Sequence, residues 1–540
     1  MALGDFSFPD RQTVLGQLRD GDAPPWDLIV VGGGITGAGV LREAARRGYR
    51  ALLLEQQDYS WGTSSRSSKM VHGGLRYLAS GDYKLTRDSL RERERLLREA
   101  PGLVDRMGYY FTVRKKTFPN RLVMSLVLAV YDWIAGVRDH RACNNDELVE
   151  NYPGLSCSDL KGACYYTDAV TDDSRLVLRV LQEAFLAGGK ALNYLPVKQL
   201  LKEGGDVRGV LVEDPASGAI LPIRASVVIN ATGAWADNLR NEVNPEKRIR
   251  PLRGSHLVIP QSRLHVSQAL ALLHPQDKRA VFIFPWEGTT VIGTTDLDHT
   301  GDPNTEASIT EQEVHYLLSM VDHQFPDAQI GLADIISTWS GVRPVIGAEH
   351  ATDPSKERRD HAVWCDSGLV SVSGGKLTTF RLIALDALKA AAARLPVVEE
   401  CLQEQIFTPP DRLACELMPS DPEWGQRLLG RYGSLATILL AIAPAAEHRR
   451  IVGTDFCMAE CRWALQRESV LHLDDLLLRR TRLGQLLPAG GEALFEQLRL
   501  LFAEERGWND LQWQVELDRY KHIWQLYYSL PAQLIAAVER

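Results

Sequence analysis

The residues best suited to chemistry lie in two consecutive segments near the N-terminus. In the first, Gly32, Gly34 and Gly37 fit the pattern G-x-G-x-x-G, and Glu55 follows at about the usual spacing of ~20 residues. Small residues let the backbone approach a pyrophosphate, and an acid at this spacing accepts hydrogen bonds from ribose hydroxyls. The segment therefore predicts a dinucleotide site. FAD and NAD both fit it, whereas the acidic ribose partner argues against NADP.

The second segment is Thr63-Ser-Ser-Arg-Ser-Ser-Lys-Met-Val-His-Gly-Gly-Leu-Arg-Tyr77. It places hydroxyls, cations and paired glycines just past the ribose-binding acid. Hydroxyls and close backbone approach are useful along a cofactor's phosphates. We therefore expect this segment to line a polar pocket beside the cofactor.

A Rossmann-like unit must position these residues. The apolar, β-branched run 28–31 predicts a strand that is buried on both faces of a parallel sheet. A helix from about 35 to 47 should follow the glycines and end at Gly48, and residues 51–54 predict the second strand.

The rest of the chain up to about residue 393 alternates between strands and helices. Charged residues dominate 89–99, which predicts a helix with a solvated face. The further strands and the helix are expected at 195–201, 207–213, 220–223, 225–230, 368–372 and 380–393. Thr408-Pro-Pro-Asp411 is typical of a linker, and the pattern beyond it is helical. We therefore expect an N-terminal tail over 1–25, interleaved cofactor- and substrate-binding domains over 26–407, and a helical domain over 411–540.

Length and composition narrow the functional classes. A chain of 540 residues is too long for one core. The net charge of −8 gives no sign of a nucleic-acid surface. The 8 cysteines are scattered without metal-ligand spacing, so we expect no metal and reduced thiols in a cytoplasmic protein. Neither a signal peptide nor a membrane-spanning segment is expected.

One apolar segment, 122–134, leaves two interpretations open. It follows Arg114, Lys115, Lys116 and Arg121 and contains tyrosine and tryptophan. About 13 residues are too few to span a bilayer, but a basic lead-in and an apolar helix can lie in the membrane interface. A buried core helix fits the pattern equally well.

Several motifs, in this order along nearly the whole chain, resemble those of FAD-dependent aerobic glycerol-3-phosphate dehydrogenases. These enzymes are membrane-associated members of the glycine-oxidase-like flavoproteins. The motifs are Thr63–Tyr77, Asn230–Trp235, Arg253–His256, Ile292–Asp296, Ser340–Pro344, Arg359–Asp360, Gly374–Thr379 and Asp474–Leu483. The resemblance implies an α/β fold in which a Rossmann-like FAD-binding domain is joined to an antiparallel-sheet substrate domain and an all-helical C-terminal domain.

The resemblance also implies which residues hold FAD. The glycine-rich fingerprint and its acid would hold the ADP half of FAD, and the polar segment would line the pyrophosphate and the ribityl chain. A backbone contact would hold the adenine, and a late glycine-rich turn would lie at the isoalloxazine. In that order the residues are Gly32, Gly34, Thr36, Gly37 and Glu55; Thr63, Ser64, Ser65, Gly73 and Gly74; Val197; and Gly374, Gly375, Lys376, Leu377 and Thr378. Ala231, Thr232 and Gly233 would form a second contact with the dinucleotide.

The implied substrate is glycerol 3-phosphate, whose dianion suits fixed guanidinium forks. The substrate residues implied by the resemblance are Arg76, Tyr77, His256, Thr295, Arg343 and Arg359. His256 is the favoured general base, because imidazole titrates near working pH. Arg343 or Tyr77, polarising the substrate oxygen, is the rival, and Lys376 can stabilise negative charge on the reduced flavin.

The resemblance implies oxidation of sn-glycerol 3-phosphate to dihydroxyacetone phosphate by hydride transfer to FAD, with electrons passed to a membrane quinone. It further implies a homodimer that is peripherally associated with the inner face of the cell membrane. An oxidase that uses O2 is one alternative. Departures from the family's motifs, such as Ala79 in place of an acid, leave open a paralogue that acts on another phosphorylated polyol. A silent flavin scaffold is disfavoured because the anion-binding residues are all present.

Overall fold

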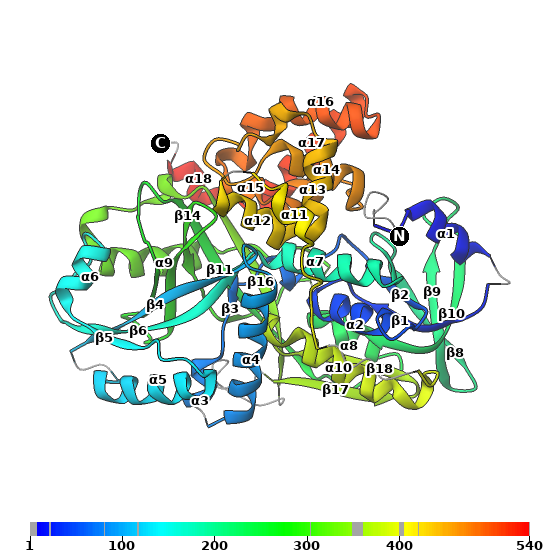
Figure 1. Ribbon diagram of the computed structural model, residues 1–540, viewed down its shortest axis with the longest axis horizontal. Helices are drawn as coiled ribbons and strands as arrows, with labels where there is room; N and C mark the ends of the chain where they lie inside the picture. Colours follow the sequence, from blue (N-terminus) through cyan, green and yellow to red (C-terminus); the bar gives the residue numbers. More distant parts are fainter. Residues whose placement is uncertain are drawn as a thin grey trace.

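Two β-sheets built from interleaved parts of the chain form the framework of this computed structural model (Figure 1). The structure describes residues 8–20, 23–79, 81–115, 118–302, 304–347, 360–398, 404–419 and 421–538. The first sheet takes its strands from 26–54, 190–230 and 361–374, and the second takes most of its strands from the segments between.

The first sheet is the mainly parallel sheet predicted around the glycine-rich turn. Its strands are β1 Trp26–Val31, β2 Ala51–Leu54, β7 Lys190–Leu192, β8 Val197–Glu203, β9 Asp206–Glu213, β10 Ile220–Asn230, β17 His361–Asp366 and β18 Leu369–Gly374. β1 pairs in parallel with β2 and β10, and Val31 lies opposite both Leu54 and Asn230. Because the carboxyl ends of these strands meet, Gly32 and Glu55 follow at one edge of the sheet.

Three helices cover this sheet: α2 Ile35–Ala45, α7 Asp173–Leu186 and α10 Phe380–Ala391. α2 packs against both of the others. A Cβ atom on Gly39 would lie 2.9 Å from the Phe380 ring, so α2 and α10 approach each other closely here. This packing fixes the N-terminus of α2 above the glycine-rich turn.

The second sheet confirms the predicted antiparallel substrate domain. Its strands are β3 Met70–Val71, β4 Val104–Arg114, β5 Arg141–Cys143, β6 Leu160–Thr171, β11 Ile249–Pro260, β12 Ala269–Leu273, β13 Ala280–Trp286, β14 Thr289–Gly293, β15 Leu297–Asp298 and β16 Ser337–Ile346. All of these pairs are antiparallel except that of β4 with β12. β16 lies beside β11, and α9 (Glu311–Gln324) buries Val314, Leu317 and Val321 in the core of this domain.

The charged helix expected at 89–99 is part of α4 (Tyr83–Glu99), and the prediction of a merely solvated face is wrong. Arg93 is 1% exposed and pairs with Asp168 on β6 at 2.6 Å. Glu92 is also buried and pairs with Arg381 on α10. The charges on α4 therefore join the two sheet domains. The other short helices of these domains are α3 Leu75–Ala79, α5 Arg121–Ala135, α6 Asn145–Asn151 and α8 Ala236–Arg240.

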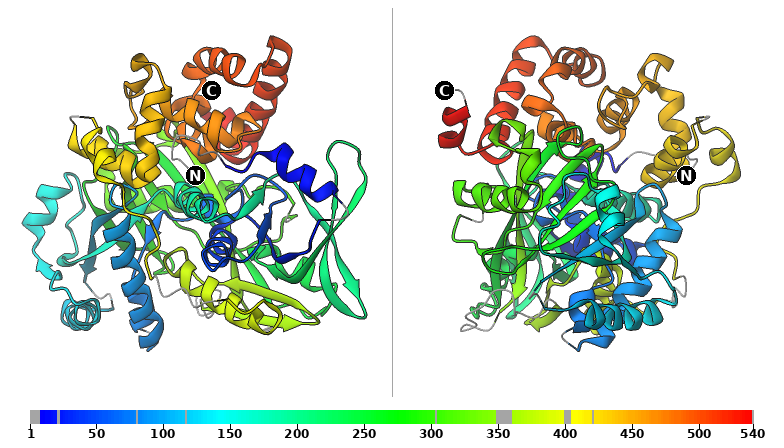
Figure 2. Two further views of the ribbon diagram at one scale, coloured as in Figure 1. Left: turned by 45° about the vertical axis from the view of Figure 1, so that its right-hand side comes forward. Right: turned by 90° about the vertical axis from the view of Figure 1, so that its left-hand side faces the viewer.

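The C-terminal part is helical, as predicted, and lies over one edge of both sheets (Figures 1 and 2). Its helices are α11 Arg412–Glu416, α12 Pro422–Tyr432, α13 Ala436–Ile442, α14 Met458–Arg467, a π-helix Asp475–Arg480, α15 Leu483–Leu486, α16 Phe495–Arg506, α17 Asp510–Tyr527 and α18 Ala532–Val538. Arg479 and Arg480 each lie 2.6 Å from the buried Asp58 of the first sheet domain. Buried ion pairs therefore attach this domain to the cofactor side of the molecule.

The N-terminal segment bears on the expected domain organisation. Residues 11–19, within the expected N-terminal tail, form helix α1, whose Val14, Leu15 and Leu18 are buried in the core of the first sheet domain. None of the helices in the described ranges is long and apolar enough to cross a membrane.

Candidate active site

The glycine-rich turn between β1 and α2 forms a cradle in which backbone atoms nearly touch. A Cβ atom on Gly37 would lie 1.9 Å from the Gly32 carbonyl oxygen. Gly32 itself has a φ of +109°, and a Cβ atom there would lie 2.6 Å from the Ala231 carbonyl oxygen. Side chains at Gly32 and Gly37 are therefore excluded, as a site for a pyrophosphate at a helix N-terminus requires.

Two side chains close this cradle. Glu55 accepts hydrogen bonds from the backbone N–H groups of Gly33 (2.6 Å) and Gln57 (2.8 Å). Each carboxylate oxygen keeps a lone pair for a ribose hydroxyl. Ser64 accepts a hydrogen bond of 3.0 Å from the Ile35 N–H in the first turn of α2. The donor set fits the ADP half of a dinucleotide.

Replacing Gly37 with alanine should abolish FAD retention, because the new methyl group and the Gly32 carbonyl cannot occupy the same space. We expect the dissociation constant for FAD to rise by at least about tenfold, which corresponds to ~1.4 kcal/mol. The measurement is fluorescence titration of the apoprotein with FAD. Gly16→Ala in α1, where a Cβ atom meets nothing within 4 Å, is the matched control. Unchanged FAD affinity in Gly37→Ala would show that FAD does not bind in this cradle.

The remaining residues expected around the ADP half gather at the same sheet edge. Ala231 follows β10, and its N–H donates to the Val31 carbonyl at 2.8 Å. Val197 begins β8, two residues after Leu195, whose N–H donates to the Glu55 carbonyl at 2.8 Å. Thr36 lies half-buried in the first turn of α2, and Thr232 and Gly233 continue from Ala231 into a short 3₁₀ turn.

The polar segment runs from this cradle to the second sheet. Thr63–Ser65 form a 3₁₀ turn, and the Thr63 hydroxyl donates to the Val342 carbonyl on β16. The Arg66 carbonyl oxygen then lies 2.3 Å from the position that a Cβ atom on Gly341 would take. One continuous stretch of backbone therefore connects the pyrophosphate end of the cradle to the face of β16.

Farther along, the paired glycines meet the late glycine-rich turn. Gly74 has a φ of +86°, and a Cβ atom there would lie 2.9 Å from Lys376 Nζ. This ammonium lies 3.5 Å from the centre of the Tyr77 ring and donates to the Ser89 hydroxyl at 3.1 Å. Gly74, Tyr77 and Lys376 thus converge, as expected for the flavin end of the site.

The same turn is joined to the segment before Gly73. The Thr378 hydroxyl donates to the His72 carbonyl at 3.2 Å, and Leu377–Thr379 form a 3₁₀ turn that leads into α10. The backbone at Gly374 and Gly375 is left-handed, with φ values of +81° and +76°. The side chain of Arg76, and Arg359 altogether, lie outside the described residues.

His256 and Arg343 share one face of the second sheet. Across β11 and β16, Leu252 pairs with Arg343, Gly254 with Gly341, and His256 with Trp339. Because opposite residues and every second residue point to the same side, these side chains lie on a common face. The two glycines between the histidine and the arginine contribute no side chains to that face, and the Arg66 backbone and the Arg343 guanidinium lie over them.

Arg343 lies over this glycine floor. A Cβ atom on Gly254 would lie 2.6 Å from one of its terminal nitrogens. That nitrogen donates to the Thr294 hydroxyl at 3.1 Å, and the other lies 3.8 Å from Asp296. The Arg343 side chain is 28% exposed while it is held by these neighbours.

Thr295, expected to contact substrate, has a buried hydroxyl with other partners. It donates to Glu313 on α9 at 2.7 Å and accepts from the Ser255 N–H at 2.9 Å. The hydroxyl next to Arg343 belongs instead to Thr294. Thr294 and Thr295 are adjacent in one motif, so the sequence could not show which of the two hydroxyls lies beside Arg343.

His256 is buried, with 1% of its surface exposed. Its ring stacks on Trp339, with 4.8 Å between ring centres, and Nε2 is hydrogen-bonded to the Ser68 hydroxyl at 2.9 Å. Burial, and then the positive charges of Arg343 and Lys69, hold the pKa of His256 well below its ordinary value. The imidazole is therefore neutral near pH 7, as a general base must be.

Comparison with known proteins identifies this arrangement. A family model described as FAD dependent oxidoreductase matches residues 27–381, and one described as C-terminal domain of alpha-glycerophosphate oxidase matches residues 399–512. The chain is 34% identical to a glycerol-3-phosphate dehydrogenase of Mycobacterium leprae over 505 residues, covering 89% of this chain and 85% of that protein. It is 32% identical to an aerobic glycerol-3-phosphate dehydrogenase of Staphylococcus saprophyticus over 499 residues, covering 87% and 88%.

The chain belongs to the FAD-dependent glycerol-3-phosphate dehydrogenase family. FAD is therefore its cofactor, and the choice between FAD and NAD is settled. The crystal structure of the glycerol-3-phosphate dehydrogenase from Bacillus halodurans complexed with FAD superimposes with a TM-score of 0.75 at 28% identity, covering 96% of this chain and 98% of that one. Glycine oxidase from Bacillus cereus (TM-score 0.51, 18% identity, 69% and 98% coverage) shares the fold.

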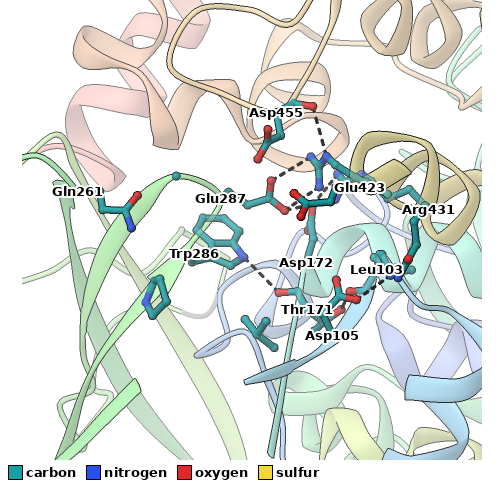
Figure 3. A pocket seen from close by; sticks show the side chains of 16 residues that line it. Leu103, Asp105, Thr171, Asp172, Gln261, Trp286, Glu287, Glu423, Arg431 and Asp455 are labelled. Atoms are coloured by element: carbon teal, nitrogen blue, oxygen red, sulfur yellow. Dashed lines mark hydrogen bonds and ion pairs between the residues drawn. The ribbon is translucent and has the colours of Figure 1, made fainter. Parts of the chain in front are cut away.

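A cavity of about 410 Å³ lies away from the residues assigned to this family's cofactor and substrate (Figure 3). Its walls include Asp172, Trp286, Glu287 and Arg431, so it opens between the second sheet and the helical domain. The Trp286 ring faces Lys69, whose ammonium also lies 4.8 Å from Trp339, the residue stacked on His256. Two tryptophans and a lysine therefore separate the cavity from His256.

Proposed function

We propose that the chain oxidises sn-glycerol 3-phosphate to dihydroxyacetone phosphate and passes the electrons to a membrane quinone. The observation that supports this most directly is the shared face of β11 and β16, where His256 and Arg343 flank a floor made of Gly254 and Gly341. The polar segment from the FAD cradle reaches the same face. A small phosphorylated alcohol would there lie between an anion-binding fork and a neutral base.

The chain's own residues divide the chemical work. The Arg343 fork binds the phosphate dianion, with Arg76 and Arg359 as further predicted ligands. His256 receives the proton from the hydroxyl on C2 as that carbon loses its hydride. Bound FAD supplies the acceptor for this hydride. Lys376, held over Tyr77, places positive charge where negative charge develops on reduction.

Anaerobic titration of the flavin absorbance tests this reaction. We expect stoichiometric bleaching by sn-glycerol 3-phosphate and none by glycerol, which lacks the dianion that Arg343 binds. A panel of other phosphorylated polyols covers the possibility of a shifted substrate preference. Bleaching by another member of the panel, with glycerol 3-phosphate inert, would replace the proposed substrate.

An oxidase that reduces O2 is the second candidate, because the C-terminal match is to a domain of alpha-glycerophosphate oxidase. Stopped-flow mixing separates the two functions. The reduced enzyme should be reoxidised slowly by air and rapidly by a soluble quinone. Fast reoxidation by air with no gain from quinone would establish the oxidase.

Helix α5 supports the membrane part of the proposal, since it has two different faces. Leu122, Leu126 and Trp133 are 82%, 68% and 81% exposed and recur at helical spacing. On the other side, Met124 and Leu128 are buried. The buried side fits the interpretation as a core helix, and the exposed apolar stripe supports the interpretation as an interfacial helix.

The buried face of α5 leads toward the flavin end of the site. The Tyr131 hydroxyl donates to Asp168 at 2.8 Å, and the Gly73 N–H donates to the same carboxylate oxygen at 2.9 Å. An α-helix is only about 10 Å wide. A quinone at the exposed face of α5 would therefore lie one helix away from the paired glycines.

The basic residues before α5 contribute less than their sequence suggests. Arg114 is buried and paired with Asp159, so it is occupied within the protein, and Lys116 lies outside the described residues. Lys115 and Arg121 are exposed. Membrane binding should therefore depend mainly on the apolar stripe and only moderately on anionic lipid.

Replacing Leu122, Leu126 and Trp133 together with serine should lower partitioning onto vesicles at least about tenfold, because each buried apolar side chain contributes ~1.5 kcal/mol or more. Flotation with phosphatidylcholine vesicles containing phosphatidylglycerol measures this, and dye-linked activity should be unchanged. Leu511 and Val515, exposed on α17, provide the matched serine control. Equal partitioning of both variants would remove α5 from the membrane contact.

A further inference from the structure

Three charged side chains, fully buried where the helical domain meets the two sheet domains, form a cluster next to the polar segment. They are Lys69 of that segment, Asp173 at the start of α7, and Arg482 of the helical domain. Asp173 lies 2.8 Å from Lys69 Nζ and is also paired with Arg482. Burial, and then the charge of Arg482, lower the pKa of Lys69 to about 8.

This cluster holds alternate residues of the polar segment. The Ser65 carbonyl accepts hydrogen bonds from Lys69 Nζ (2.6 Å) and Arg482 (3.1 Å). Asp173 accepts from the backbone N–H of Ser67 (2.9 Å) and from its hydroxyl (2.7 Å). Residues 65, 67 and 69 are therefore all fixed from one side.

Ser68 lies between two of these fixed residues and has a different partner. Ser68 is partly buried, and its hydroxyl is hydrogen-bonded to His256 Nε2 at 2.9 Å. Trp339 strengthens this alignment, because its indole N–H donates to the Ser67 carbonyl at 3.1 Å while its ring stacks on His256. The other ring nitrogen of His256, Nδ1, is buried and has no hydrogen-bond partner among the described residues.

We propose that Ser68 connects the buried His256 to the substrate and that Arg482, from the C-terminal domain, holds Ser68 in position. The imidazole is buried, whereas Ser68 is only partly buried, so the Ser68 hydroxyl is the part of this pair that a substrate can reach. Ser68 accepts the proton of the C2 hydroxyl and passes its own proton to His256 Nε2. The C2–H bond breaks in the same oxidation, and its electron pair leaves with the hydride.

In this scheme Ser68 is a catalytic residue and Arg482 is a positioning residue. The scheme rests on the proposed function, since the donor is the C2 hydroxyl of a phosphorylated polyol. Its consequence is that the helical domain, which holds no residue assigned to substrate or cofactor, controls the rate of hydride transfer.

The first experiment measures the anaerobic rate of flavin reduction in Ser68→Ala, His256→Asn and the double variant. General base catalysis contributes about 10²- to 10⁴-fold, and we expect Ser68→Ala to lose at least about tenfold of it. The double variant should match His256→Asn within about threefold, because two residues on one proton path are not additive. Ser68→Thr, which keeps the hydroxyl, should retain most of the rate.

Two results would overturn the relay. One is a Ser68→Ala rate within about twofold of wild type, and the other is a double variant whose loss is the product of the single losses. Reduction of the wild type by glycerol 3-phosphate tests the proposed function separately. The relay is tested by rate ratios with whichever phosphorylated polyol reduces the wild-type flavin.

The second experiment tests the clamp through Arg482→Lys, which keeps the charge but loses the fork. We expect faster hydrogen–deuterium exchange over residues 63–71 of the FAD-bound protein. Flavin reduction should slow about three- to tenfold, because small misplacements of catalytic groups are costly, while substrate affinity stays constant. Arg462→Lys is the control, since the ion pairs that Arg462 makes with described residues, Glu447, Glu504 and Glu505, all lie within the helical domain.

Ser67→Ala provides a milder form of the same test, because it removes the hydroxyl's hydrogen bonds to Asp173 and from the Lys69 N–H but leaves the ion pairs of Asp173 with Lys69 and Arg482 in place. Ser67→Ala should also speed up exchange over residues 63–71 and slow flavin reduction, but by less than Arg482→Lys. It therefore tests the clamp even if Arg482→Lys fails to fold. Wild-type exchange and wild-type reduction rates in Ser67→Ala and in folded Arg482→Lys would show that the helical domain does not position Ser68.

Discussion

Replacing His256 with asparagine should lower kcat for glycerol 3-phosphate by about 10²- to 10⁴-fold, the usual contribution of a general base. KM should change little, because Arg343, which is proposed to bind the phosphate, is unchanged in this variant. Asparagine keeps a polar group of similar size in the site and cannot take up a proton. The measurement is dye-linked steady-state turnover of the FAD-loaded enzyme.

A second buried histidine provides the control. His274 is also stacked on an aromatic ring, that of Tyr316, with 3.7 Å between ring centres. It is hydrogen-bonded to the Tyr316 carbonyl and lies in the same sheet domain. His274→Asn should therefore report the structural cost of losing a buried imidazole. Equal losses of turnover in the two variants would deprive His256 of its catalytic role.

The pH dependence of wild-type turnover should also reflect the role of His256 as the general base. Burial, Arg343 and Lys69 all disfavour the charged imidazole, so the pKa of His256 in the free enzyme lies below its ordinary value. The acidic limb of kcat/KM, which reports the free enzyme, should therefore fall below pH 6.5. A phosphate dianion bound at Arg343 offsets one of these charges, so the acidic limb of kcat should lie at higher pH. An acidic limb of kcat at lower pH than that of kcat/KM would contradict this electrostatic account.

Arg343→Lys should reduce kcat/KM by about 10- to 100-fold, since a charged hydrogen bond contributes ~1.5–3 kcal/mol and a lysine cannot replace a two-pronged fork. Part of the loss should be in KM, because the phosphate is bound before and during the reaction. Part should be in turnover, because a loosely held phosphate leaves C2 misaligned. Steady-state kinetics with glycerol 3-phosphate separates the two.

The matched control for this prediction is Arg253→Lys. Arg253 lies three residues before His256 on the same strand, so its side chain points to the opposite face of the sheet. There it pairs with Glu313 at 2.8 Å. Loss of its fork should leave kcat/KM near the wild-type value. If Arg343→Lys behaves like Arg253→Lys, the anion site lies elsewhere.

Local patterns predicted the strands, the turn and the helix of the proposed cofactor site. The glycines, the helix after them and the acid at the end of the second strand are specified by residues that are close in sequence. The observed β2 spans the predicted 51–54, and α2 begins at the predicted Ile35. Strand register then fixes the rest, because neighbouring parallel strands end at one edge of the sheet.

Contacts between distant residues were not predictable in the same way. The charged pattern of α4 is that of a solvated helix, yet Arg93 is buried against Asp168, which lies 75 residues away. Ser68 and His256 are 188 residues apart, and nothing in either motif indicates that they meet. The Asp474–Leu483 motif could be assigned to a domain, but its contact with the polar segment depends on how that domain lies on the sheets.

The contact between Ser65 and Arg482 has a consequence for how the enzyme comes into being. These partners are 417 residues apart, and Arg482 comes from the last domain to be synthesised. Domains tend to fold in order as the chain leaves the ribosome. The cofactor cradle can therefore form early, whereas the segment that reaches His256 obtains its final anchor only when synthesis is nearly complete. A truncated chain could hold FAD and still lack the geometry to oxidise an alcohol.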